Sequence, residues 1–235
     1  MGFRERIIKR KKNISGQDIL SSLSGKYCIG CGLGLPSQTV NKCPQCGHDQ
    51  RAPIAKKTTN PHDMARAAIS FGCSISMSDE YKEYIDDLVK GYGTRVDQPK
   101  KNQLLKVFLL SDLAITSIVY FAHYEGNPKH EEIVECFKEA LDDYLLHVYG
   151  KDEFQDARSC LASMMTEYFE AFNEKNWLHS FSRVLQYRAE SMILGVLLPG
   201  KKFALPSAHA FAKYLVHISS FLPPLQATLN KWDIP

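Results

Sequence analysis

Two closely spaced cysteine pairs constrain this sequence more than any other feature. Cys28 and Cys31 are separated by two residues, Cys43 and Cys46 repeat that spacing, and eleven residues lie between the pairs. Each pair can bind a metal ion from one tight turn, and the segment between them is long enough to bring the second turn opposite the first. The spacing therefore predicts a tetrahedral Zn²⁺ site with these four cysteines as ligands.

A site with four thiolate ligands is closed, and this excludes several roles for the metal. It has no open coordination position for water or substrate, so zinc catalysis is not expected. Residues 26–50 are too few to bury a core alone, and metal binding worth on the order of 10 kcal/mol is expected to fold them. The scattered Cys73, Cys136 and Cys160 are expected to be buried apolar side chains.

The residues around the cysteines resemble a known module. The stretch YCIGCGLGLPSQTVNKCPQCGHD is similar to the minimal zinc ribbon, which reads C-x2-C-G, a short segment often containing Leu-Pro, and C-P-x-C-G. The resemblance implies that Cys28, Cys31, Cys43 and Cys46 are the zinc ligands. It covers about a tenth of the chain, and such modules occur in proteins of many functions. Rubredoxins share the paired turns but place aromatic residues between them, whereas residues 32–42 contain none, so an iron electron carrier is not expected.

Charge is distributed unevenly along the chain. Residues 1–60 contain 11 Lys or Arg and 3 Asp or Glu (+8), whereas residues 61–235 contain 18 and 23 (−5). Six of the basic residues fall close to the N-terminus: Arg4, Arg6, Lys9, Arg10, Lys11 and Lys12. A basic arm of this kind is typical of contact with nucleic acid or an acidic protein surface. Residues 1–12 also fit an anchor on anionic lipid, and a solvated terminus is the alternative without function.

The composition of successive segments predicts four parts. Residues 1–25 form the basic lead and residues 26–50 form the zinc ribbon. Residues 51–61 contain two prolines and no apolar periodicity, which indicates a linker. From residue 62 to residue 235 apolar residues recur at helical spacing, and no stretch alternates with a period of two. The expected fold is therefore mainly α, with the small ribbon followed by an all-α bundle of about six or seven helices.

The helical signals place these helices approximately. They are expected near residues 78–91, 101–122, 128–149, 154–172 and 177–198, and from Pro206 to Pro223-Pro224. Asn127 followed by Pro128 predicts an N-cap with proline at the first helical position. The run from Val107 to Ala122 is apolar nearly all round, which indicates a central buried helix. It is short and contains Asp112, which disfavours a membrane span.

Asp112 is the unusual residue of this run, because an unpaired charge in an apolar helix is costly. Arg183 and Arg188, in another mostly apolar segment, are its expected partners in a buried polar cluster. The alternative is that Asp112, Arg183 and Arg188 line a polar pocket that holds a ligand. The sequence contains no GxSxG, HExxH, GxxxxGK[ST] or GxGxxG motif, which argues against several enzyme classes.

These observations together favour a non-enzymatic adaptor, or a subunit of a larger assembly, that contacts nucleic acid or a protein partner through its basic arm and ribbon. A cytoplasmic location is expected, because the N-terminus is charged where a signal peptide is apolar. The alternatives are a ligand-binding helical protein or enzyme, and membrane association through residues 1–12. Self-association is also an option, because residues 129–156 are acidic and the segment after residue 175 is basic.

Overall fold

The fold is that of a computed structural model of the whole chain. The structure describes residues 27–28, 30–32, 35, 41–52, 56–76, 78–79, 82–83, 85–86, 97–174, 180, 183–184, 187–188, 191, 195–196 and 208–235. The six basic residues of the N-terminal lead lie outside this part of the chain, as do most residues of the helices expected at 78–91 and 177–198.

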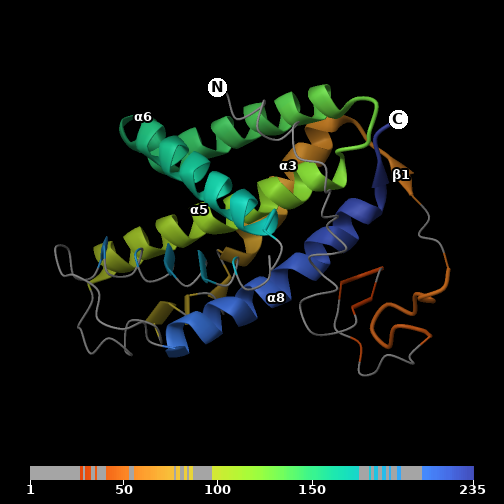
Figure 1. The fold of residues 1–235 in the computed structure, drawn as a ribbon, viewed down its shortest axis with the longest axis horizontal. Coiled ribbons are helices and arrows are strands. Elements are labelled where there is room, and N and C mark those ends of the chain that lie inside the picture. Colours follow the sequence, from red (N-terminus) through yellow and green to blue (C-terminus); the bar gives the residue numbers. More distant parts are fainter. Residues whose placement is uncertain are drawn as a thin grey trace.

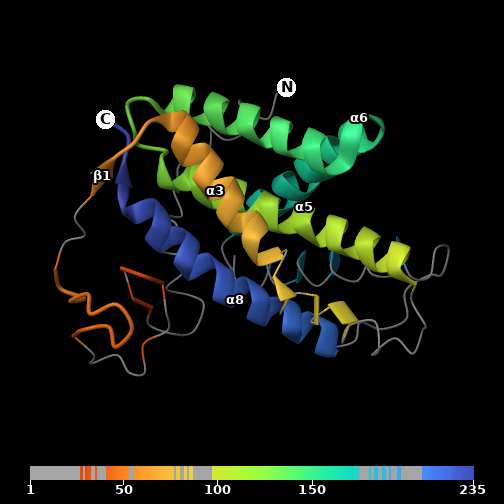
Figure 2. The ribbon, with the colours of Figure 1, turned by 180° about the vertical axis from the view of Figure 1, so that it is seen from behind.

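The described part is mainly helical, as predicted, but the number of helices differs from the expected six or seven. It contains four helices, α3 (Pro61–Ser76), α5 (Gln98–His123), α6 (His130–Phe172) and α8 (Ala208–Asn230), and two short strands, β1 (Lys57–Thr58) and β2 (Trp232–Asp233). Figures 1 and 2 show that α3 runs between α6 and α8 and crosses α5. One buried apolar core joins all four helices.

The helix α5 is the centre of the core, as its apolar pattern predicts. Its N-terminus is capped by Asp97, whose side chain accepts a hydrogen bond from the backbone N–H of Lys100 at 3.0 Å. Every residue from Phe108 to Tyr120 is buried. By length and composition alone α5 qualifies as a membrane span, but 78% of its most apolar window is buried within the fold. This burial is typical of a core helix, and it accounts for the apolar composition of α5.

The element α6 is divided by a kink. It contains two of the expected helices, which meet at Gly150, a residue with non-helical backbone angles (φ 72°, ψ 175°). A positive φ of this size is favourable for glycine and costly for other residues. Figure 1 shows the resulting bend, which folds the second half of α6 back over the bundle. The sequence correctly places the break between the two helices at Gly150.

The start of α6 corrects another prediction. Asn127 does not cap the helix, which begins at His130 after an N-cap residue, Lys129, that makes no side-chain cap hydrogen bond. The Asn127 amide instead holds a turn, because its oxygen accepts from the N–H of Lys129 at 2.8 Å. Its nitrogen donates to the carbonyl oxygen of Ile234 at 2.9 Å. The Asn127 side chain therefore binds the C-terminal residues through Ile234.

Pro223 and Pro224 do not end the last helix, which was the expectation from sequence. Both lie inside α8, which continues to Asn230. Neither proline has an N–H group, so the carbonyl groups of Ser219 and Ser220 lose their usual helical donors. The helix persists because its later residues are packed into the core, including the fully buried Leu225 and Leu229. Tertiary burial outweighs the local cost of the prolines.

The two strands join distant parts of the chain. β1 and β2 pair in parallel, with Lys57 beside Trp232 and Thr58 beside Asp233. The N–H of Lys57 donates to the carbonyl of Lys231 at 2.8 Å. β1 lies within residues 51–61, which the sequence suggests are a linker, and α3 already begins at Pro61. The segment after the cysteines is thereby attached to the C-terminus.

Candidate metal centre

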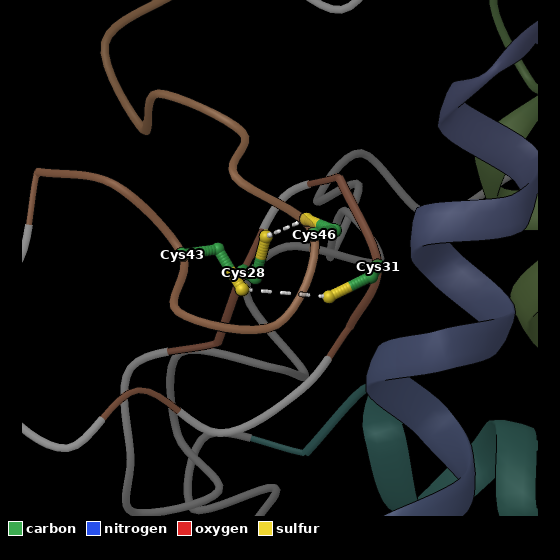
Figure 3. A group of neighbouring side chains, drawn as sticks. All are labelled: Cys28, Cys31, Cys43 and Cys46. Carbon is green, nitrogen blue, oxygen red and sulfur yellow. Dashed lines mark hydrogen bonds between the residues drawn. The ribbon is translucent and has the colours of Figure 1, made fainter.

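The four predicted ligands meet in space, as Figure 3 shows. The sulfur atoms of Cys28, Cys31, Cys43 and Cys46 all lie within 4.8 Å of one another. The Sγ atoms of Cys28 and Cys46 are 3.6 Å apart, and those of Cys31 and Cys43 are 3.7 Å apart. Both distances are far longer than a disulfide bond of about 2.05 Å. They match the separation of about 3.8 Å between sulfurs placed tetrahedrally at 2.3 Å from zinc.

Each cysteine pair lies on a turn that closes through its own backbone. The N–H of Gly32 donates to the carbonyl of Cys28 at 2.7 Å, and the N–H of Gly47 donates to the carbonyl of Cys43 at 2.9 Å. Both glycines have positive φ, 78° and 71° respectively. A glycine directly after each CxxC pair therefore has a physical reason, because other residues are strained in this conformation.

Hydrogen bonds to sulfur favour the thiolate form that a metal needs. The Nε2 atom of Gln50 and the backbone N–H of Gly30 each donate to the Sγ of Cys28 at 3.3 Å. Burial alone raises the pKa of Cys28, but these donors outweigh it and lower the pKa to about 6. Cys28 and Cys43 are buried, Cys31 is half-buried and Cys46 is exposed. The donor set and its geometry fit a thiophilic divalent ion such as zinc.

The cysteine cluster is fitted closely to the helical bundle. A Cβ atom placed on Gly32 would lie 2.3 Å from the backbone nitrogen of Pro224 and 2.4 Å from its Cα. The first cysteine turn therefore packs directly on the backbone of α8 at its proline pair. Figure 3 shows α8 on the side of the cluster nearest Cys31. The cluster is also attached through β1, which follows it in sequence.

The structure places His217 beside Asp112, a neighbour that the sequence analysis does not name. This carboxylate is fully buried and its Oδ2 atom lies 3.0 Å from the Nε2 atom of His217 on α8. Arg188 instead pairs with Glu167 on α6, and Arg183 is exposed. His217 is brought to Asp112 by α8, which packs against α5. The three residues do not form one buried cluster.

Two further structural features have weak signals in the sequence, and a third has none. His217 could have been found as a polar residue on an apolar helix. Asn60 and Pro61 repeat the Asn-Pro signal of a helix start, and the Oδ1 atom of Asn60 accepts from the N–H of Asp63 at 2.8 Å. The contact of Gly32 with α8 has no sequence signal, because it depends on the tertiary arrangement.

The comparisons with known proteins give no match: no family model, no curated protein and no solved structure is similar to this chain.

Proposed function

We propose that this chain is a non-enzymatic adaptor, or a subunit of a larger assembly, in which a structural zinc ion organises a ribbon at residues 26–50. The carrying observation is that four sulfur atoms lie within 4.8 Å of one another, with two of the pairs near the separation expected around tetrahedral zinc. The ribbon and the basic lead before it are the contact region, and nucleic acid is the preferred partner. Reducing conditions, as in the cytoplasm, keep the four thiols available.

Two properties of the cluster support a structural rather than a catalytic ion. Four thiolates fill the coordination sphere, so water and substrate have no position on the metal. Gly32 packs against the backbone of Pro224, and this contact holds the ribbon against α8. A metal ion that holds the ribbon in place would also fix the point from which the basic lead extends. The charge of the first 60 residues, +8, supports a polyanionic partner.

Metal content tests the first part of this proposal. The purified chain is expected to contain one zinc ion, measured by elemental analysis against protein concentration. Cys43→Ser should lose the ion, because it removes a buried ligand. Cys73→Ser is the matched control and should retain it, because Cys73 lies in the helical core. A metal-free wild-type chain with normal helical content would contradict the proposal.

Partner capture tests the second part. The full chain is used as bait in native lysate, with and without nuclease. A variant with six glutamines is compared, in which Arg4, Arg6, Lys9, Arg10, Lys11 and Lys12 are replaced. A charge-matched control replaces six exposed bases of the helical part: Lys82, Lys100, Lys129, Lys138, Lys151 and Arg158. Recovery of nucleic acid or of a defined protein that only the first variant loses supports the proposal, and equal recovery by both variants contradicts the role of the basic lead.

A further inference from the structure

A surface cavity of about 590 Å³ lies beside the strand pair, away from the four sulfurs. The helix α3 contributes Asp63, Met64 and Ala67, which follow one another along a single face of its first turns. The strand β2 contributes Trp232, and Thr58 of β1 completes the rim. The cavity therefore combines an aromatic ring, an apolar floor from the buried Met64, and polar groups at its edge.

A basic side chain lies over Trp232, and other lysines occur near it in the strand pair. Lys57 is its partner in the strand pair, and the Lys57 ammonium lies over the indole, 5.9 Å from the ring centroid. Lys231 precedes it in sequence and is exposed. Lys56 is also exposed and lies 3.8 Å from the Asp233 carboxylate. One ammonium group, that of Lys57, therefore lies over the indole, and two further exposed lysines lie close to Trp232 in sequence or in the strand pair.

The acidic group in the cavity is already engaged. The Oδ2 atom of Asp63 accepts a hydrogen bond from Nδ2 of Asn60 at 2.7 Å, and the Asn60 oxygen accepts from the N–H of Asp63. The carboxylate also lies at the N-terminus of α3, where negative charge is favourable. The Asp63 carboxylate can still accept a hydrogen bond from an amino or imino group. Nucleobases carry such donor groups on their edges.

We propose that this cavity, with Trp232 as its platform, receives one unpaired base of a single-stranded nucleic acid. The base stacks on the indole, its edge meets Asp63 and Asn60, and the phosphates on either side meet Lys57 and Lys231. A ring stacked on the indole displaces the Lys57 ammonium, which then lies near the adjoining phosphate. Aromatic stacking beside a basic track is how single strands are bound without reading a duplex groove. This inference rests on the proposed function and names its partner class.

The test uses the full zinc-containing chain and a fluorescently labelled single-stranded homopyrimidine oligonucleotide. Ala67→Leu fills the cavity from an exposed helical position without touching Trp232. Ala162→Leu is the matched control, because Ala162 is an exposed alanine on α6. Stacking of one base is worth enough that Ala67→Leu should weaken binding at least about fivefold. The control should bind like the wild type.

A second readout does not depend on filling the cavity. The chain has two tryptophans, so in Trp177→Phe the emission comes from Trp232. Saturating oligonucleotide should quench this emission. Replacing Lys57 and Lys231 by glutamine should reduce the slope of log affinity against log salt by about 1.4, because about 0.7 counterions are released per contact on a single strand.

The possible results separate this inference from the proposed function. Weakened binding by Ala67→Leu together with quenching supports the inference. Binding that is equal in Ala67→Leu and Ala162→Leu overturns it, while leaving metal content and partner capture untouched. Equal affinity for a duplex of the same sequence also overturns it, because a paired base cannot enter the cavity. If the zinc-containing chain captures only a protein partner and binds no oligonucleotide, the inference is wrong and the adaptor proposal stands.

Discussion

Gly32 lies against the backbone of Pro224, so the turn that follows the first two cysteines is seated on α8 with no room for a side chain. The contact links the cysteine cluster near the beginning of the chain to a helix near its end. A second link is the pairing of β1 with β2. The cluster and the bundle are therefore expected to stabilise each other, rather than to behave as separate modules on a string.

Substitution of Gly32 measures this contact. Gly32→Ala and Gly47→Ala both place a side chain at positive φ, which costs about 1–2 kcal/mol. Only Gly32→Ala also brings a Cβ atom to 2.3 Å from Pro224, whereas a Cβ on Gly47 meets nothing within 4 Å. Gly32→Ala should therefore lower the free energy of unfolding by a further 1–3 kcal/mol or so, measured in urea. Equal losses for the two variants would show that the ribbon is not seated on α8.

The pair of Asp112 with His217 is expected to contribute strongly to the helical core. Asp112 is fully buried and the pair joins α5 to α8. Removing one partner of a buried hydrogen bond leaves the other unsatisfied at a cost of about 1–3 kcal/mol, so Asp112→Ala should show a clear loss in chemical unfolding. The control is Glu135→Ala, which breaks an exposed pair with Lys138 and should cost at most about 1 kcal/mol. A loss for Asp112→Ala as small as that of the control would contradict the structural assignment.

His123 predicts the direction of the pH dependence of stability. Burial lowers its pKa to about 4, with Lys56 adding to the effect, and the Nδ1 atom lies 3.0 Å from Nε2 of Gln226. The unfolded chain takes up this proton near pH 6.5, whereas the folded chain does so only near pH 4. Protons therefore favour unfolding, and stability should fall by up to roughly 3 kcal/mol between pH 6.5 and pH 4.

Comparison of two histidine variants isolates this contribution. His123→Gln keeps a hydrogen-bonding partner for Gln226 but cannot take up a proton, so its stability should fall less over that pH range. His62→Gln is the control at an exposed position and should follow the wild type. Urea unfolding at half-unit pH intervals gives the curves. Parallel curves for wild type and His123→Gln would show that His123 does not couple folding to pH.

Parts of this fold are visible in the sequence because they depend on local patterns. The cysteine spacing predicts the approach of four sulfur atoms, and an apolar run predicts the central position of α5. The break at Gly150 follows from glycine between two periodic segments. These features need no knowledge of distant residues.

The missed features depend on which elements meet in three dimensions. The neighbour of Asp112 in the core depends on the packing of α8 against α5, which brings His217 to it, and no local pattern predicts this. Pro223 ordinarily ends a helix, yet burial of the following turns keeps α8 intact. The cavity beside Trp232 is formed by α3 and the strand pair, and no local sequence pattern predicts it.

Removal of the metal should make four cysteines available for alkylation and leave the other three protected. The chain has seven free cysteines, of which four form the cluster. Bound zinc blocks their sulfurs, so a native zinc-containing chain should react slowly with iodoacetamide near pH 8. A chelator should release them, because the unligated thiols regain access to the reagent, with Cys46 already exposed at the surface.

The three remaining cysteines provide the internal control in the same experiment. Burial raises the pKa of Cys73 to about 12, and it also raises the pKa of Cys136 and Cys160. A protonated thiol is a poor nucleophile, so the buried Cys73 and Cys136 and the half-buried Cys160 should react slowly as long as the bundle is folded. Intact mass should therefore shift by four added groups after chelation, and peptide mapping should place them at the cluster. Modification of Cys73 at the same rate would mean that loss of the metal also opens the helical core.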